Sequence, residues 1–200
     1  MKKITSLFLT LCLLLAAFPS GAEDAPSSVL VVYFSRAGEN WSVGFIEEGN
    51  TAKLAKVIAE QTAADLFEIV PEVPYPADYD STLAVATREK EEDARPAYLN
   101  EIENWEQYDT VFLGYPIWWG GVPCIVYTFL ESLDFTGKAV IPFNTHEGSG
   151  QAGTQQQIEE KLPGVTVLPG LAVRGSKAQN DAEGTAKDVS NWLNSLNLSK

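Results

Sequence analysis

The chain has 200 residues, of which 45% are hydrophobic and 20% charged, with 15 glycines and 11 prolines. This balance is that of an ordinary globular domain, and it excludes a collagen, a coiled coil and a wholly disordered chain. The formal net charge is −13, from 27 acidic and 14 basic residues. Such a charge argues against a nucleic-acid partner, which needs clustered lysine and arginine, and favours a partner with a basic docking surface.

The N-terminus has the pattern of a secretory signal peptide. Lys2 and Lys3 precede an apolar run over residues 7–18, and small residues follow at 20–22. The run is 12 residues long, whereas a membrane-spanning helix needs about 20, so a membrane anchor is the weaker interpretation. We expect residues 1–22 to be a signal peptide that is cleaved after Ala22. The mature protein would then be secreted or periplasmic, with no membrane span.

The mature chain is predicted to begin with a disordered lead-in at 23–28, followed by one domain over 29–197. Cleavage of the signal leaves one cysteine, Cys124, which cannot form an internal disulfide. Because it lies in an apolar stretch, we interpret it as a buried core thiol. Together with the single histidine, His146, it supplies too few ligands for a zinc site.

The predicted elements alternate between strands and helices along the domain. Apolar runs of strand length predict buried strands at 29–34, 66–70, 110–115, 138–143 and within 165–173. The segments between them predict helices at 51–62, with Asn50 as N-cap, and at 80–94, 122–133, 151–161 and 180–196, plus a helix or turn at 99–106. This alternation predicts a parallel sheet covered by helices on both faces. Ligands of such sheets bind beyond the carboxyl ends of the strands, so the loops there carry the functional argument.

The loop after the first strand has the composition of an anion site. It begins with Ser35-Arg36-Ala37-Gly38 and returns through Gly49-Asn50-Thr51 to the first helix. A hydroxyl, glycines and free backbone N–H groups at a helix N-terminus favour a phosphate. The alternative is a plain strand-to-helix turn with a good cap. No GxxxxGK[ST] motif is present, so the loop is not a P-loop.

The loop after the third strand contains two adjacent tryptophans, Trp118 and Trp119, between glycines. Aromatic surface at a strand end suggests a stacking surface for a planar ligand. The alternative is that one ring packs inward and the other packs against a neighbouring loop.

The loop after the fourth strand, 144–150, is rich in hydrogen-bond donors and in glycine, and it holds His146. A lone histidine is usually a structural hydrogen-bonder, but this one lies at the ligand end of the sheet. A GxGxxG pattern occurs at 148–153, but the acidic residue expected about 20 positions later in a dinucleotide fingerprint is missing.

With the motifs VVYFSRAGEN…GNT, LGYPIWWG and NTHEGSG, the chain resembles the flavodoxin-like family over about residues 29–196. The resemblance implies an α/β fold of the flavodoxin-like, three-layer kind: a five-stranded parallel sheet of order 2-1-3-4-5 with helices on both faces. It also implies non-covalently bound FMN. The phosphate would lie on Ser35, Arg36, Ala37, Gly38, Asn50 and Thr51. The isoalloxazine ring would lie on Pro116, Ile117, Trp118, Trp119 and Gly120, and on Thr145, His146, Glu147, Gly148 and Ser149.

The sequence departs from that family in two places. The phosphate loop is split by an insertion at 39–49, where Trp41 and Phe45 either fold over the cofactor or make a partner surface. An export signal is also unusual for a flavodoxin. A receiver domain shares the strand order, but it needs an aspartate at the end of the third strand, where this chain has Tyr115-Pro116.

These observations favour an exported FMN-binding electron-transfer protein, a monomer or weak dimer, that exchanges electrons with a redox partner protein. One alternative is a single-domain NAD(P)H-dependent FMN oxidoreductase acting on quinones or flavins, with His146 as a proton donor. A second alternative is an FMN-binding module without turnover.

Overall fold

The computed structural model describes residues 28–196. The predicted signal peptide and nearly all of the predicted lead-in lie outside the described residues. None of the helices within 28–196 is long and apolar enough to cross a membrane.

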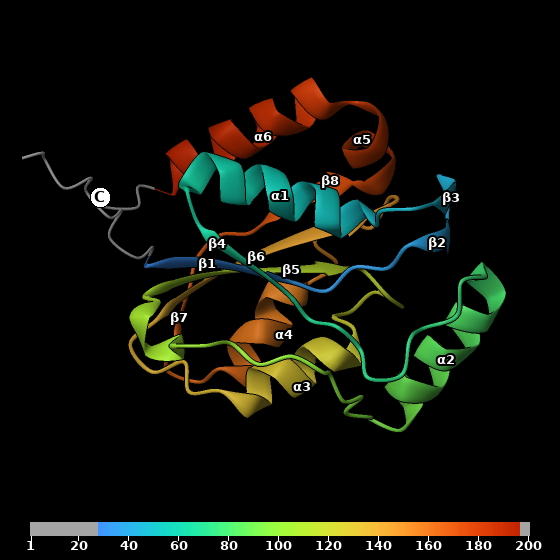
Figure 1. Cartoon of the computed structure of the whole chain (residues 1–200), viewed down its shortest axis with the longest axis horizontal. Helices are drawn as coiled ribbons and strands as arrows, with labels where there is room; N and C mark the ends of the chain where they lie inside the picture. Colours follow the sequence, from blue (N-terminus) through green and yellow to red (C-terminus); the bar gives the residue numbers. More distant parts are fainter. Residues whose placement is uncertain (1–27, 197–200) are drawn as a thin grey trace, which may run out of the picture.

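A parallel sheet forms the middle of the domain (Figure 1). Its strands are β1 (Val29–Tyr33), β4 (Asp65–Glu68), β5 (Thr110–Pro116), β6 (Ala139–His146), β7 (Thr166–Val167) and β8 (Leu171–Arg174). The order is β4-β1-β5-β6, with β7 and β8 both pairing with β6. The predicted order 2-1-3-4-5 is therefore confirmed. The fifth position is held by two short segments, because Pro169-Gly170 interrupts the strand expected within 165–173. Of the two expectations for that dipeptide, that it breaks or extends the strand, the break is confirmed.

Helices cover both faces of the sheet, as predicted (Figure 1). One face carries α1 (Asn50–Thr62), α5 (Gly175–Asn180) and α6 (Ala182–Ser195), and the other carries α3 (Cys124–Ser132) and α4 (Thr154–Lys161). The helix α2 (Tyr79–Glu91) lies beyond the carboxyl ends of the strands, and a 3₁₀ turn occupies Trp105–Gln107. Cys124 is buried, as predicted.

The core consists of two apolar clusters, one on each face of the sheet. Phe129 of α3 and Tyr115 of β5 belong to one, and Ile58 of α1 and Phe143 of β6 belong to the other. The central strands contribute to both clusters in alternation, as expected of strands that are buried on both faces. Because the core holds β5 and β6 on both faces, it determines where their carboxyl ends lie and where the following loops begin.

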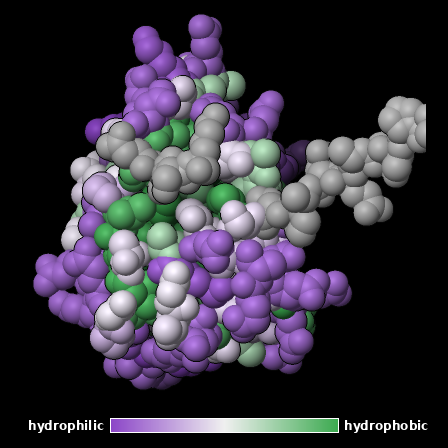
Figure 2. All heavy atoms as spheres, turned by 90° about the vertical axis from the view of Figure 1, so that its left-hand side faces the viewer, coloured by the Kyte–Doolittle hydropathy of each residue, from purple (hydrophilic) through white to green (hydrophobic). Residues whose placement is uncertain are grey.

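The carboxyl ends of the strands meet at one edge of the sheet. Pro116 of β5 is in register with Thr145 of β6, and His146 of β6 is in register with Arg174 of β8. The strand β6 runs three residues beyond its predicted end at 143, so Asn144, Thr145 and His146 belong to the strand rather than to a loop. The opposite end of the molecule, seen in Figure 2, shows apolar surface in its middle and hydrophilic side chains around it.

The insertion forms an antiparallel hairpin that the sequence patterns did not predict. It pairs β2 (Gly38–Asn40) with β3 (Gly44–Ile46), and it turns through Ser42 and Gly44, whose φ angles are +70° and +71°. The hairpin stands beside the N-terminal end of α2 (Figure 1), where the Glu39 backbone N–H donates to the Ala77 carbonyl at 2.7 Å.

One predicted helix feature is wrong in detail. Gly49, not Asn50, is the N-cap of α1. Glycine has no side chain that could act as a cap, and the Ser35 hydroxyl takes that role by accepting from the Ala52 N–H at 3.0 Å.

The predicted helix 180–196 is confirmed as α6, which begins at Ala182. Asp181 caps it by accepting from the Gly184 N–H at 2.9 Å. The short helix α5 that precedes it was not predicted.

Candidate functional site

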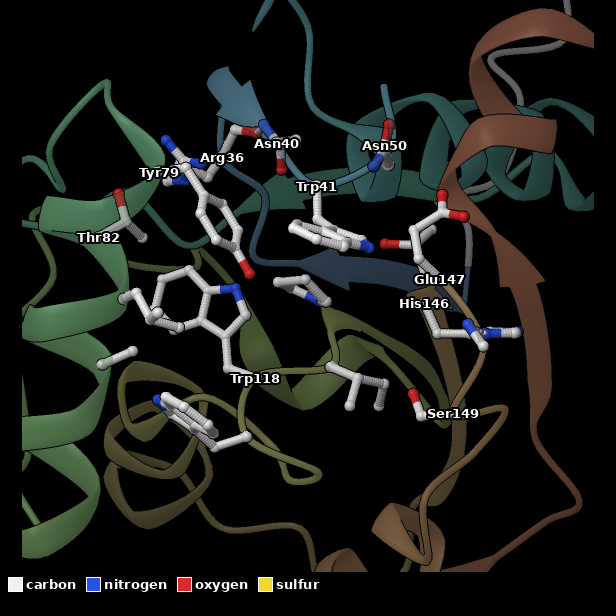
Figure 3. A pocket seen from close by; sticks show the side chains of 17 residues that line it. Arg36, Asn40, Trp41, Asn50, Tyr79, Thr82, Trp118, His146, Glu147 and Ser149 are labelled. Carbon is white, nitrogen blue, oxygen red and sulfur yellow. Dashed lines mark hydrogen bonds between the residues drawn. The ribbon is translucent and has the colours of Figure 1, made fainter. Parts of the chain in front are cut away.

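A cavity of about 350 Å³ opens at the carboxyl ends of β5 and β6, between the hairpin, α2 and the start of α1 (Figure 3). Its volume is within the range of small-molecule and cofactor sites. Most of the predicted site residues line it: Arg36, Asn50, Pro116, Ile117, Trp118, Trp119, Thr145, His146, Glu147, Gly148 and Ser149.

Five predicted residues do not line this cavity: Ser35, Ala37, Gly38, Thr51 and Gly120. Ser35 and Ala37 border a smaller hollow beside β1, and Gly120 borders a separate cavity next to Trp119. Thr51 is buried, and its hydroxyl lies 2.8 Å from that of Thr145, which joins α1 to the end of β6. Thr51 therefore supports the cavity wall through Thr145, which does line it.

The start of α1 is built to accept an anion. A Cβ added to Gly49 would lie 2.2 Å from the Ser35 Oγ and 2.7 Å from the Arg36 carbonyl, so only glycine lets the loop come this close to the helix. The first turn of α1 contains no acidic residue. Its N–H groups lack intrahelical acceptors, and Ser35 occupies only that of Ala52. The helix therefore presents positive backbone charge at Asn50, which lines the cavity.

Arg36 serves mainly as a clamp. Its Nη1 donates to the carbonyls of Pro76 and Ala77 at 2.9 and 3.2 Å, and its Nη2 donates to the Glu39 carbonyl. Burial lowers the pKa of Arg36, against the opposing effect of the Asp78 and Glu39 carboxylates. Because three carbonyls already hold the guanidinium, it ties the hairpin to the segment before α2 while it lines the cavity.

The two tryptophans of the third loop are held differently. Trp118 packs edge-on against Phe34 and Tyr75, with ring centroids 5.4 and 5.0 Å apart, so its ring is anchored in the core while it faces the cavity. Trp119 is half-exposed and has a positive φ of +48°. Its carbonyl accepts from the Lys90 ammonium of α2 at 2.8 Å. The inward packing of one of the two rings is confirmed for Trp118. The stacking of either ring on a planar ligand stays a prediction.

His146 and Glu147 face the cavity from the end of β6. The His146 Nδ1 accepts from the Gly148 N–H at 2.9 Å, so the neutral ring carries its proton on Nε2. Burial, and then the nearby Arg174, lower the pKa of His146, which keeps the ring neutral at pH 7. Glu147 accepts from the Ser176 N–H at 2.5 Å and from the Ser176 hydroxyl at 3.1 Å. Glu147 therefore secures the start of α5 and is not a free ligand.

Several residues line the cavity without having been predicted. They come from the hairpin and from α2: Asn40, Trp41, Tyr79, Thr82, Leu83 and Ala86. For Trp41 the sequence contained an indication, because an aromatic residue lies inside an insertion in the phosphate loop. The α2 residues carried none, because a charged helix predicts only a surface and does not indicate that the surface borders a site. Residues 28–196 contain no cluster of side chains that could hold a metal ion.

Comparison with known proteins gives a consistent result. A family model described as Flavodoxin matches residues 28–196. The chain is similar to the solved structure of a candidate flavoprotein from Bacteroides eggerthii (29% identity, 86% of this chain and 98% of that chain, TM-score 0.69). A candidate flavoprotein from Bacteroides uniformis is also similar (29% identity, 85% and 99%, TM-score 0.67).

A flavoprotein from Lactobacillus acidophilus, solved in complex with FMN, shares the fold (22% identity, 76% and 95%, TM-score 0.59). Comparison with curated proteins returned no match.

Proposed function

The chain belongs to the flavodoxin family, and from this premise we propose that it is an exported electron-transfer protein. Its cofactor is FMN. The observation that carries the proposal is the cavity itself, which joins an aromatic wall at Trp118 to a helix N-terminus at Asn50.

The residues of the cavity fit this cofactor at both of its ends. The N-terminus of α1, free of acidic residues in its first turn, suits a phosphate. The apolar residues Pro116, Ile117 and Trp118, together with the polar chain from Thr145 to Ser149, suit a flat ring with polar edges. FMN supplies the redox chemistry, while the protein binds it, orients it and adjusts its electronics.

The charge of the protein supports electron transfer to a partner. The net charge of −13 makes it costly to add negative charge to a ligand in the cavity, which favours a low reduction potential. The same charge would steer a partner with a basic docking surface towards the protein. The half-exposed Trp119 places the rim of the cavity within reach of such a partner.

In the first test, the purified mature chain is loaded with FMN and the unbound FMN is removed. We expect a flavin absorption spectrum that stays with the protein. NADH or NADPH alone should reduce it slowly, and a basic reductase should reduce it rapidly, with a rate that falls as salt is added. Retained FMN that no donor protein reduces would instead favour a binding module without turnover. A folded chain that retains no FMN would contradict the proposal.

The second candidate function is a reductase of quinones or flavins that uses NAD(P)H. The observation that favours it is His146, a neutral ring with a proton on Nε2 at the cavity wall. Such a group can donate a proton to a reduced substrate. Rapid reduction of the bound flavin by NADH or NADPH alone would select this function over the carrier. His146→Gln should then leave that reduction rapid and slow the turnover of the quinone substrate.

Export is the remaining part of the proposal, and it depends on the N-terminal pattern of residues 1–22. Expression of the full chain in a bacterium should yield a mature protein in the periplasm or the medium. Its N-terminal sequence should begin at Glu23. An intact N-terminus in the cytoplasm would contradict this part alone.

A further inference from the structure

The β2–β3 hairpin holds an indole at the mouth of the cavity. Trp41 lies at the turn of the hairpin and lines the cavity, yet it is 67% exposed. Large aromatic side chains stabilise a protein mainly through the surface that they bury, so an exposed one adds little to folding. An exposed aromatic side chain that lines a cavity of ligand size is typical of a binding site.

The base of the hairpin is fixed, so the position of Trp41 is a property of the fold. Arg36 donates to the Glu39 carbonyl, and the Glu39 N–H donates to Ala77 at 2.7 Å. The Asn40 side-chain amide donates to the carbonyls of Gly38 and Arg36 at 3.1 and 3.3 Å. These contacts join β2 to the rest of the protein, and β3 is held through its pairing with β2.

Tyr79, the first residue of α2, supports the indole from the side. The two ring centroids are 5.8 Å apart, with an angle of 40° between the planes. The Tyr79 N–H donates to the Glu39 carboxylate at 3.2 Å, so the hairpin also positions this second ring. Figure 3 shows Trp41 and Tyr79 on the hairpin side of the cavity and Trp118 on the side of the third loop.

We propose that Trp41, supported by Tyr79, is a direct binding residue for the isoalloxazine ring and forms the outer wall of its site. The inference rests on the proposed function, because it takes FMN as the ligand. In this arrangement the chain supplies aromatic surface from two separate segments, the insertion at 39–49 and the loop at 116–120. The outer wall shields the ring from solvent and from dissolved reductants, which suits electron transfer through the exposed rim.

The hairpin offers a matched control in Phe45. This side chain is 73% exposed and lies on the same hairpin, but it borders a different hollow, with Glu39, Ala77 and Asp78. Loss of Phe45 therefore removes a comparable amount of exposed aromatic surface without touching the cavity. A general effect of weakening the hairpin would appear in both variants.

The experiment compares the full mature chain with Trp41→Ala, Trp41→Phe and Phe45→Ala. The dissociation constant of FMN and the quenching of its bound fluorescence by iodide are measured. We expect Trp41→Ala to raise the dissociation constant about tenfold or more, and Trp41→Phe to raise it by about threefold, since a smaller aromatic ring keeps part of the contact. Phe45→Ala should change it by less than about twofold. Iodide should quench FMN more strongly in Trp41→Ala only.

Equal dissociation constants in Trp41→Ala and Phe45→Ala would overturn the inference, as would a wild-type ring that iodide reaches as easily as in Trp41→Ala. Trp41 would then be free for a partner protein. Loss of FMN binding by the folded wild-type chain would overturn the proposed function together with this inference. Retention of FMN by every variant with unchanged affinity would overturn the inference alone.

Discussion

Trp118 and Trp41 border the same cavity from different segments, and the chain holds them in different ways. Trp118 contacts Phe34 and Tyr75 edge-on, at the end of a strand that is buried on both faces. Trp41 has one aromatic neighbour, Tyr79, and is mostly exposed. One wall is therefore packed against the folding core, and the other is an exposed side chain on a hairpin.

A tryptophan that borders a binding cavity can therefore have two roles: it can pack in the core as well as line the cavity, or it can only line the cavity. A wall that is packed into the core is ordered before the ligand binds. A substitution there, however, changes both the affinity for the ligand and the free energy of unfolding. A wall on a clamped hairpin can change without disturbing the core. Substitutions in the two walls should therefore affect stability and affinity in different proportions.

The largest expected effect is that of Trp118→Ala. The substitution leaves a cavity beside Phe34 and Tyr75, so we expect a loss of about 3 kcal/mol in the free energy of unfolding. Trp41→Ala should change the same quantity by less than about 0.5 kcal/mol, because its side chain is mostly exposed. Chemical denaturation of both variants measures the contrast. Equal losses would show that the two walls are anchored alike.

A smaller loss is expected from Arg36→Met, which removes the clamp of the hairpin. The variant removes the charged donor shared by the carbonyls of Pro76, Ala77 and Glu39, so we expect a loss of about 2 kcal/mol. The Pro76 and Ala77 carbonyls keep a second donor each, the Thr82 hydroxyl and the Glu39 N–H. Amide hydrogen exchange should become faster in the β2–β3 hairpin. It should not change in β5, the strand that precedes Trp118. Arg88→Met, on the exposed side of α2, serves as the control and should leave both rates unchanged.

Lys90→Met should lower the free energy of unfolding by a still smaller amount. It tests the rim of the cavity at Trp119. The Lys90 ammonium holds the Trp119 carbonyl, but the pair is exposed, so we expect a loss of only about 0.5 kcal/mol. The positive φ of Trp119 is then less well supported. Amide exchange at Gly121, whose N–H donates to the Trp118 carbonyl at 2.9 Å, should become faster. Lys187→Met on α6 is the control. An unchanged rate at Gly121 would show that the loop needs no such support.

The sheet was predictable from the sequence because its central strands are buried on both faces. Continuous apolar runs such as 29–34 and 110–115 have few alternative structures, and alternation with helices then determines the layers. The fifth strand was harder to predict, because Pro169-Gly170 in its middle weakens the pattern on either side. The hairpin could not be predicted at all, since segments of three residues carry almost no periodicity.

The site was predictable at and just beyond the carboxyl ends of the strands, as at His146, the last residue of β6, and Trp118, which follows β5. It was not predictable where the residue reaches the cavity through packing of distant segments. Tyr79 lines the cavity because Arg36 and Glu39 dock the hairpin on the start of α2, a contact over about 40 residues of sequence. No local pattern encodes that contact.

The smallest expected effect is a pH dependence from His146, which lies in neither aromatic wall. Its pKa is lowered in the folded protein, chiefly by burial, so the folded state disfavours the protonated ring. The free energy of unfolding should therefore be highest above the ordinary histidine pKa of about 6.5 and should decline as pH falls from there towards the lowered value. His146→Gln lacks this group, so the difference in stability between wild type and variant should shrink in that pH range. Denaturation midpoints of both proteins from about pH 8 to about pH 5 measure it. Parallel curves for the two proteins would mean that burial and Arg174 leave the pKa of His146 unaltered by folding.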